Sequence, residues 1–156
     1  MTLFLKLSGD NHKKVKEIGF SLLTEGKTLK VKADGYSMYP AIKPGSVIYI
    51  EPLIDKRMPD PGEIIAWKRD TGFVVHRLIR IEEEEGKTYY ITRGDSCKNE
   101  DKPVFPDQVA GKVVRAENSS GKRNETGRKL ISKPVYLYNR LWVMFVIRLI
   151  KVRNLA

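Results

Sequence analysis

Ser37 and His76 are the two residues whose types and surroundings could support covalent chemistry. Ser37 lies in the segment Gly35–Pro40, where the glycine and the proline predict a rigid bend. His76 lies in a later apolar segment and is followed by Asp95 and Asp101. A serine hydroxyl is inert near neutral pH unless a base removes its proton, and a carboxylate can orient that base. These residue types are together the components of a nucleophilic hydrolase, but a serine in a glycine-containing turn is more often structural, so both interpretations stay open.

His76 would be the base in such a mechanism. Strand alternation places Val74, His76 and Leu78 on one face, and an otherwise apolar face disfavours the charged imidazole. The neutral ring is the form that a general base needs. A histidine in an apolar segment can equally be a core or edge residue with satisfied hydrogen bonds, so both interpretations stay open.

Asp95 and Asp101 are alternative partners for the second nitrogen of that ring. Either carboxylate could accept the ring N–H and thereby fix the tautomer. Aspartates after a glycine, as at Gly94, are also common turn formers that bond their own backbone. The residues alone do not choose between the two aspartates.

A helix and then a series of strands must position these residues. We predict a helix over residues 10–25, with Asp10 or Asn11 as its N-cap and Gly26 beyond its end. The following segments alternate between apolar and polar residues and are separated by Gly, Pro and Asp. Six strands are predicted, at 29–32, 46–50, 63–67, 73–81, 87–92 and 108–114. The expected fold is mostly β, with flanking helices around a coiled or barrel-like antiparallel sheet.

The composition indicates a folded chain with one main domain. Of the 156 residues, 41% are apolar and 31% are charged, which argues against extensive disorder. Cys97 is the single cysteine, so an intrachain disulfide is impossible. The two histidines, His12 and His76, are too few for a histidine-rich zinc site. We expect no metal and no other cofactor.

The positive charge is concentrated in the C-terminal part of the chain. The formal net charge is +10, and residues 111–156 contain eleven Lys and Arg against two acidic residues, which gives +9. Residues 134–156 combine apolar, aromatic and basic side chains, but their continuous apolar run is too short to span a bilayer. We expect a helix on an anionic membrane surface. The alternatives are a helix packed on the domain itself and a partner interface.

Four segments are therefore expected: a helical segment (1–27), a β domain (28–115), a flexible basic loop (116–133) and a basic apolar helix (134–156). We predict no secretory signal and no spanning helix, and we expect the chain at a membrane surface or in the cytoplasm. A basic tail could also bind nucleic acid. A single N-terminal helix is too little for a helix-turn-helix, which counts against DNA binding.

Five short motifs along the chain together resemble those of type I signal peptidases. The segment Gly35–Pro40 resembles their Ser-Met-x-Pro nucleophile motif, and Val75–Ile79 resembles the motif of the general base. The others resemble two family strand motifs and a Thr-Lys-Gly-Asp…Asp motif, at 43–48, 61–67 and 92–101. All five occur in the family's order. The resemblance implies the coiled-sheet fold of these peptidases.

The identity of residue 76 distinguishes two types within this family. Most bacterial members, and the related self-cleaving repressors of the LexA type, have lysine where this chain has His76. Histidine resembles the archaeal and endoplasmic-reticulum type. The implied roles are Ser37 as nucleophile, His76 as general base and Asp101 as its orienter, with Asp95 in a supporting role. The expected substrate contacts flank Ser37: Gly35, Tyr36 and Met38.

Three features depart from the family pattern. Gly35 stands where some members have a serine that donates to the oxyanion, so backbone N–H groups, including that of Ser37, would do this alone. Ser46 follows Gly45 where an aspartate is usual, which would affect only the turn. The usual N-terminal membrane anchor is not expected in this sequence.

The resemblance implies a serine endopeptidase that removes a leader or signal peptide from a precursor protein. The precursor is the expected partner, and a strand edge near Ser37 could pair with an extended peptide. One alternative is a self-cleaving regulator of the LexA type, against which His76 and the single N-terminal helix count. The other is an inactive domain of the same fold, against which the complete Ser–His–Asp set counts.

Overall fold

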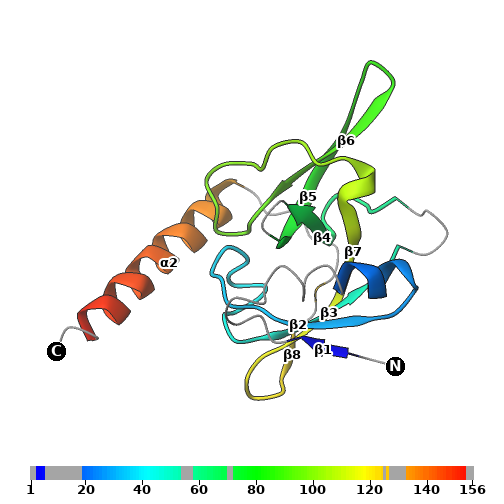
Figure 1. Ribbon diagram of the computed structural model, residues 1–156. Coiled ribbons are helices and arrows are strands. Elements are labelled where there is room, and N and C mark those ends of the chain that lie inside the picture. The colour runs from blue at the N-terminus through cyan, green and yellow to red at the C-terminus, as the bar shows by residue number, and fades with distance from the viewer. Residues whose placement is uncertain are drawn as a thin grey trace.

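A computed structural model of the chain describes residues 3–5, 19–53, 58–69, 72–124, 126 and 133–153. In this part a sheet of eight strands forms the body (Figure 1). The strands are β1 (Leu3–Leu5), β2 (Leu29–Lys32), β3 (Val47–Glu51), β4 (Ile64–Arg69), β5 (Gly72–Glu84), β6 (Lys87–Arg93), β7 (Val109–Glu117) and β8 (Arg123–Asn124). A short 3-10 helix, η2 (Pro106–Gln108), precedes β7, and the α-helix α2 (Lys133–Arg153) follows β8. The predicted mostly β fold is confirmed.

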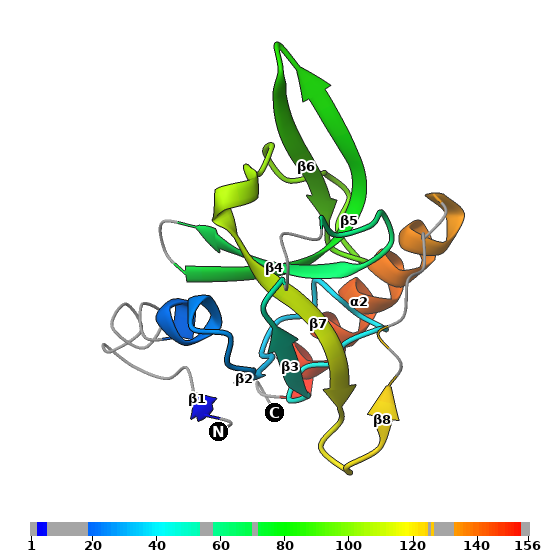
Figure 2. The same cartoon turned by 90° about the vertical axis from the view of Figure 1, so that its right-hand side faces the viewer.

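The order of the strands across the sheet differs from their order in the chain. It is β1-β2-β3-β7-β4-β5-β6, and β8 pairs with β7. The described pairs are antiparallel apart from β1 and β2, which run parallel, and β1 was not predicted. β4 and β5 form the predicted hairpin, in which Ile65 lies opposite His76. β5 and β6 form a second hairpin that projects from the body (Figure 2).

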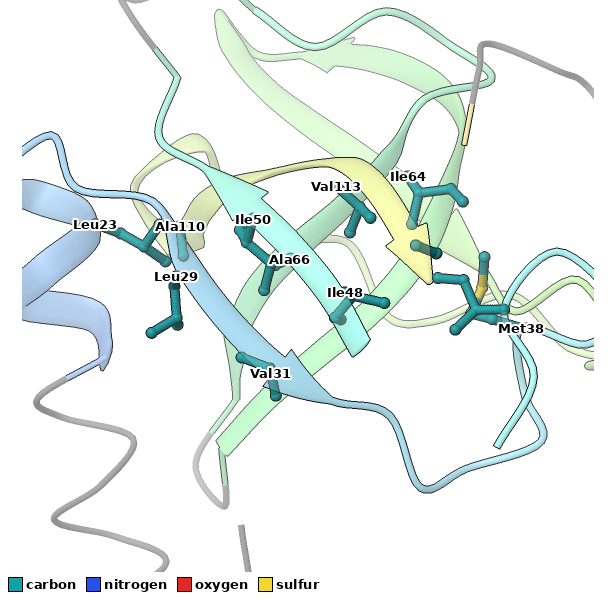
Figure 3. Packing of buried hydrophobic residues seen from close by; sticks show 12 residues of the cluster. Leu23, Leu29, Val31, Met38, Ile48, Ile50, Ile64, Ala66, Ala110 and Val113 are labelled. Carbon is teal, nitrogen blue, oxygen red and sulfur yellow. The ribbon is translucent and has the colours of Figure 1, made fainter. Parts of the chain in front are cut away.

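Alternation along the strands explains the core (Figure 3). Leu29 and Val31 of β2 are buried and lie opposite Ile50 and Ile48 of β3, respectively. The residues between them face the other side of the sheet and are less buried. A second buried cluster packs beside β5: Ile65, Trp67, Leu78, Tyr90 and Val104.

The predicted N-terminal helix is described only in its last part. Residues 19–24 are helical, and Leu23 is buried in the core. Gly26 follows with a φ of 78°, and its N–H donates to the carbonyl of Leu23 at 3.0 Å. A left-handed glycine with such a bond is a common helix end. Residues 10–18 lie outside the described residues.

Part of the segment 116–133, for which we expected a flexible loop, belongs to the sheet. β7 continues to Glu117, and a turn leads into β8. The side-chain oxygen of Asn118 accepts bonds from the N–H groups of Ser120 and Lys122, at 3.0 and 2.9 Å. An asparagine bonded to the backbone that follows it stabilises a turn. The polar composition of this segment suggested a loop. The turn that Asn118 stabilises instead lets β8 pair with β7, which extends the sheet.

The C-terminal helix α2 spans 21 residues, from Lys133 to Arg153. Its start lies one residue before the predicted boundary. Asn139 and Val143 are buried against the body. Within the described residues, no helix has the length and apolar character needed to cross a membrane.

Candidate active site

Ser37 lies in a turn between β2 and β3 that is fixed by backbone bonds and buried anchors. The N–H of Tyr39 donates to the carbonyl of Tyr36 at 3.0 Å, and the N–H of Ile42 donates to that of Met38 at 2.8 Å. Met38 and Ile42 are buried in the core. Ser37 itself remains partly exposed. The turn therefore holds the hydroxyl at the edge of the core.

Residues 94–97 contact this turn from another part of the chain. The N–H of Ser96 donates to the carbonyl of Ser37 at 2.9 Å. The hydroxyl of Ser96 lies 2.8 Å from the carbonyl of Tyr36. A Cβ atom on Gly94 would lie 2.6 Å from the carbonyl oxygen of Ser37, so only glycine fits this approach without a shift. Two segments that are distant in sequence are thus packed together at Ser37.

Asp101 contacts the ring of His76. The distance between His76 Nδ1 and Asp101 Oδ2 is 2.6 Å. The hydroxyl of Thr92 donates to the same carboxylate oxygen at 2.7 Å, and the N–H of Asp101 donates to the carbonyl of Thr92 at 2.8 Å. The side chains of His76 and Asp101 are only 13% and 12% exposed. Thr92 therefore fixes the carboxylate, and the carboxylate fixes the ring.

The charge state of Asp101 determines which ring nitrogen carries hydrogen. Burial raises the pKa of Asp101, but the His76 ring, the Thr92 hydroxyl and the positive charge of Arg69 together hold it below its ordinary value of 3.8. An ionised carboxylate can only accept hydrogen bonds, so Nδ1 of His76 is the donor. In the neutral ring the lone pair is then on Nε2.

Ser37 and His76 line one cavity of about 430 Å³. Apolar side chains of β2, β3 and β5 form much of its wall, and Lys32, Asp34 and Arg69 are its charged residues. Among the described hydrogen bonds, none joins the Ser37 hydroxyl to the ring. Such bonds are often long in free enzymes and shorten when substrate binds. The arrangement places both groups on the wall of one space that a peptide could enter.

Asp95 forms a buried ion pair with Arg77. Its two carboxylate oxygens accept from Nε and Nη2 of the guanidinium at 2.8 and 2.7 Å, and Nη1 donates to the carbonyl of Gly62 at 2.7 Å. The Arg77 and Asp95 side chains are 3% and 2% exposed. Of the two aspartates that the sequence left open, Asp101 contacts His76. Asp95 instead joins the segment after β6 to Arg77 of β5, and Arg77 also holds the turn before β4.

The three predicted substrate contacts have different surroundings. Gly35 is exposed and lines the cavity. Met38 also lines the cavity, but its side chain is 4% exposed and belongs to the core. Tyr36 is partly buried and lies outside the cavity lining, while its carbonyl accepts from Ser96.

Sequence reasoning missed Ser96, Thr92 and Arg69 as parts of this site. Ser96 follows a glycine-containing turn and carries no pattern that separates it from an ordinary turn residue. Thr92 did have a signal, since it begins the segment that resembles the Thr-Lys-Gly-Asp…Asp motif, but no role was assigned to it. The buried pair at Arg77 had a signal, because a cation next to His76 in an apolar strand needs a buried partner.

Cys97 lies beside the site but is a poor nucleophile. Burial and the negative charge of Asp101 raise the pKa of its thiol, so little thiolate is present near neutral pH. No cluster of three or more His, Cys, Asp or Glu side chains suited to a metal ion occurs within the described ranges.

Comparison with known proteins gives a distant relation to a peptidase subunit. No family model matches the chain. The chain is similar to the signal peptidase complex catalytic subunit sec11 of Schizosaccharomyces pombe, with 25% identity over 107 residues. The match covers 57% of this chain and 57% of the relative, so the chain spans less than two thirds of that protein. The similarity supports a peptidase-like enzyme related to signal peptidases at the level of the family.

Proposed function

We propose that the chain is a serine endopeptidase that cleaves leader or signal peptides from precursor proteins through Ser37, His76 and Asp101. The observation that carries the proposal is the contact of 2.6 Å between His76 and Asp101 beside a cavity that Ser37 also lines. The similarity to a signal peptidase subunit supports the class of substrate.

In the proposed reaction, Nε2 of His76 removes the proton of the Ser37 hydroxyl. The oxygen attacks the carbonyl carbon of the scissile bond and forms a tetrahedral intermediate. The ring then gives the proton to the leaving nitrogen, and the C–N bond breaks to leave an acyl-enzyme. Water, activated by the same nitrogen, hydrolyses this ester and restores the serine. Asp101 stabilises the imidazolium that forms at each step.

The developing oxyanion needs hydrogen-bond donors near Ser37. The N–H of Ser37 donates to no acceptor in the described part of the chain. It is therefore available for the oxyanion. This agrees with the glycine at position 35, which has no side-chain hydroxyl that could donate to the oxyanion. Ser96 holds the carbonyl of Ser37 and so fixes the peptide group between Ser37 and Met38.

The cavity suits an extended peptide with apolar or small side chains next to the cut. Val31, Ile48 and Phe73 contribute apolar parts of the wall, and residues 32–35 also line the cavity. Backbone at a strand end can pair with a substrate in extended form. Arg69 and Lys32 would favour an acidic group on the substrate at the rim.

Substitution of the two central residues tests the proposal. Ser37→Ala and His76→Ala should each lower turnover by about 10⁴-fold or more, because neither residue works without the other. The substrate would be a library of precursor N-terminal peptides, with cleavage sites identified by mass spectrometry. Ser119→Ala, in the exposed turn after β7, is the matched control and should retain wild-type turnover.

Wild-type turnover in either variant would refute the assignment. A wild-type chain that cleaves no peptide in the library and no precursor protein would instead support an inactive domain. Cleavage restricted to the chain's own N-terminal region would support a self-cleaving regulator.

A further inference from the structure

The exposed half of α2 is apolar. Phe145, Leu141 and Val152 are 53%, 66% and 67% exposed. At 3.6 residues per turn, seven exposed apolar residues fall on the half of the helix that faces away from Asn139 and Val143, and Trp142 lies at its edge. The seven are Leu137, Tyr138, Leu141, Met144, Phe145, Leu149 and Val152. An apolar patch of this extent marks an interaction surface.

The opposite face of α2 holds the helix to the body. The side-chain amide of Asn139 donates to the carbonyl of Asp95 at 3.3 Å, and Asn139 is 4% exposed. The guanidinium of Arg93 lies 4.4 Å from the centre of the Tyr136 ring. Beyond these contacts the helix extends away from the sheet (Figure 1), and residues 147–153 are all exposed. The described part of the chain therefore leaves the apolar half uncovered.

The charges of α2 indicate what covers it. The helix contains five basic residues and no acidic residue: Lys133, Arg140, Arg148, Lys151 and Arg153. By helical geometry, Lys151 and Arg153 lie at the two edges of the apolar half, and Arg148 lies within it. Long basic side chains can reach headgroups while their stems stay in apolar surroundings. A second copy packed on this face would bring like charges together, whereas an anionic bilayer complements them.

We propose that α2 binds the surface of an anionic lipid bilayer, with its apolar half in the interfacial region and its basic side chains at the headgroups. This inference goes beyond the proposed peptidase activity and does not depend on it. Asn139 joins α2 to the carbonyl of Asp95, next to Ser96, which holds Ser37. The bound helix would therefore set the candidate site at a fixed position relative to the bilayer.

Sedimentation of the full-length protein with lipid vesicles tests this proposal. The vesicles are phosphatidylcholine with or without phosphatidylglycerol, and Trp142 fluorescence is recorded in parallel. Trp67, the other tryptophan, is 4% exposed, so a shift to shorter wavelength on binding reports mainly Trp142. We expect binding and the shift only with phosphatidylglycerol, and weaker binding as salt increases.

Three variants assign the binding to α2. Phe145→Glu should abolish both signals, and Arg148→Glu with Lys151→Glu should weaken binding by more than about tenfold. Phe105→Glu is the matched control, since Phe105 is 44% exposed outside α2, and it should bind as wild type. Circular dichroism verifies that each variant is folded.

The proposal is overturned if Phe145→Glu binds vesicles as well as wild type does. Equal binding to vesicles without phosphatidylglycerol also overturns it. A dimer in solution that Phe145→Glu dissociates, without vesicle binding by the wild type, would assign the face to a second copy instead.

Discussion

Ser96 holds the backbone carbonyl of Ser37 through its N–H, which donates at 2.9 Å. The single hydroxyl hydrogen of Ser96 is shared between the carbonyl of Tyr36 at 2.8 Å and that of Ser37 at 3.2 Å. Ser96 is 9% exposed, so water has little access to replace these bonds. Ser37, the candidate nucleophile, is therefore positioned by a residue in a different turn. None of the described hydrogen bonds joins Ser96 to the His76 ring.

Ser96→Ala should lower kcat by roughly tenfold to a hundredfold with little change in KM, because the hydroxyl positions Ser37 and not the substrate. The free energy of unfolding should fall by about 1 kcal/mol through the lost hydrogen bond. Steady-state kinetics on a cleavable peptide and urea unfolding measure the two effects, with Ser119→Ala as control. A loss of stability with unchanged kcat would show that Ser96 has only a structural role.

Asp101→Asn should mainly lower turnover, whereas Asp95→Asn should mainly lower the stability of the fold. Asp101→Asn should lower kcat by about 10³- to 10⁴-fold, because the ring loses the carboxylate that orients it. Asp95→Asn leaves the buried Arg77 without its charge partner and should destabilise the fold by about 3–5 kcal/mol. Kinetics and unfolding of both variants separate the roles. A larger rate loss for folded Asp95→Asn than for Asp101→Asn would reverse the assignment.

The stabilising effect of Asp101 should depend on pH. Its pKa in the folded chain lies below the ordinary value of 3.8, so its contribution is fully present above that value. The contribution is lost as the pH falls through the lower, folded-state pKa. The difference in unfolding free energy between wild type and Asp101→Asn should therefore be larger near neutral pH than in strong acid. Urea unfolding across this range measures it, and a constant difference would contradict the assignment.

Gly94→Ala should impair both stability and turnover. The added Cβ would lie 2.6 Å from the carbonyl oxygen of Ser37 and 2.6 Å from Sγ of Cys97, and the backbone oxygen cannot easily move. Overpacking of this kind costs about 1–3 kcal/mol. Gly35→Ala is the control for stability, since nothing lies within 4 Å of a Cβ there. Unfolding of the two variants under the same conditions should show a loss for Gly94→Ala only.

The sequence predicted six of the strands because strand alternation is a local property, whereas the short strands β1 and β8 were not predicted. Leu29 and Val31 on β2, and Ile48 and Ile50 on β3, alternate with less buried residues as expected. The hairpin of β4 and β5 also followed from a short turn. The position of β7 between β3 and β4 did not follow, because pairing of distant strands leaves no local pattern.

For the candidate site, the residue types alone determined the chemistry that is possible: a hydroxyl, an imidazole and a carboxylate. Tertiary structure decided which carboxylate contacts the ring. Residue type alone does not separate Asp95 from Asp101, although the family resemblance favours Asp101. In the folded chain Arg77 pairs with Asp95, and Thr92 directs Asp101 toward His76. The roles of Ser96 and Asn139 likewise depend on segments that meet only in the folded chain. Hydrogen-bond partners are chosen by distance in space, and the spacing of residues along a chain does not encode that distance.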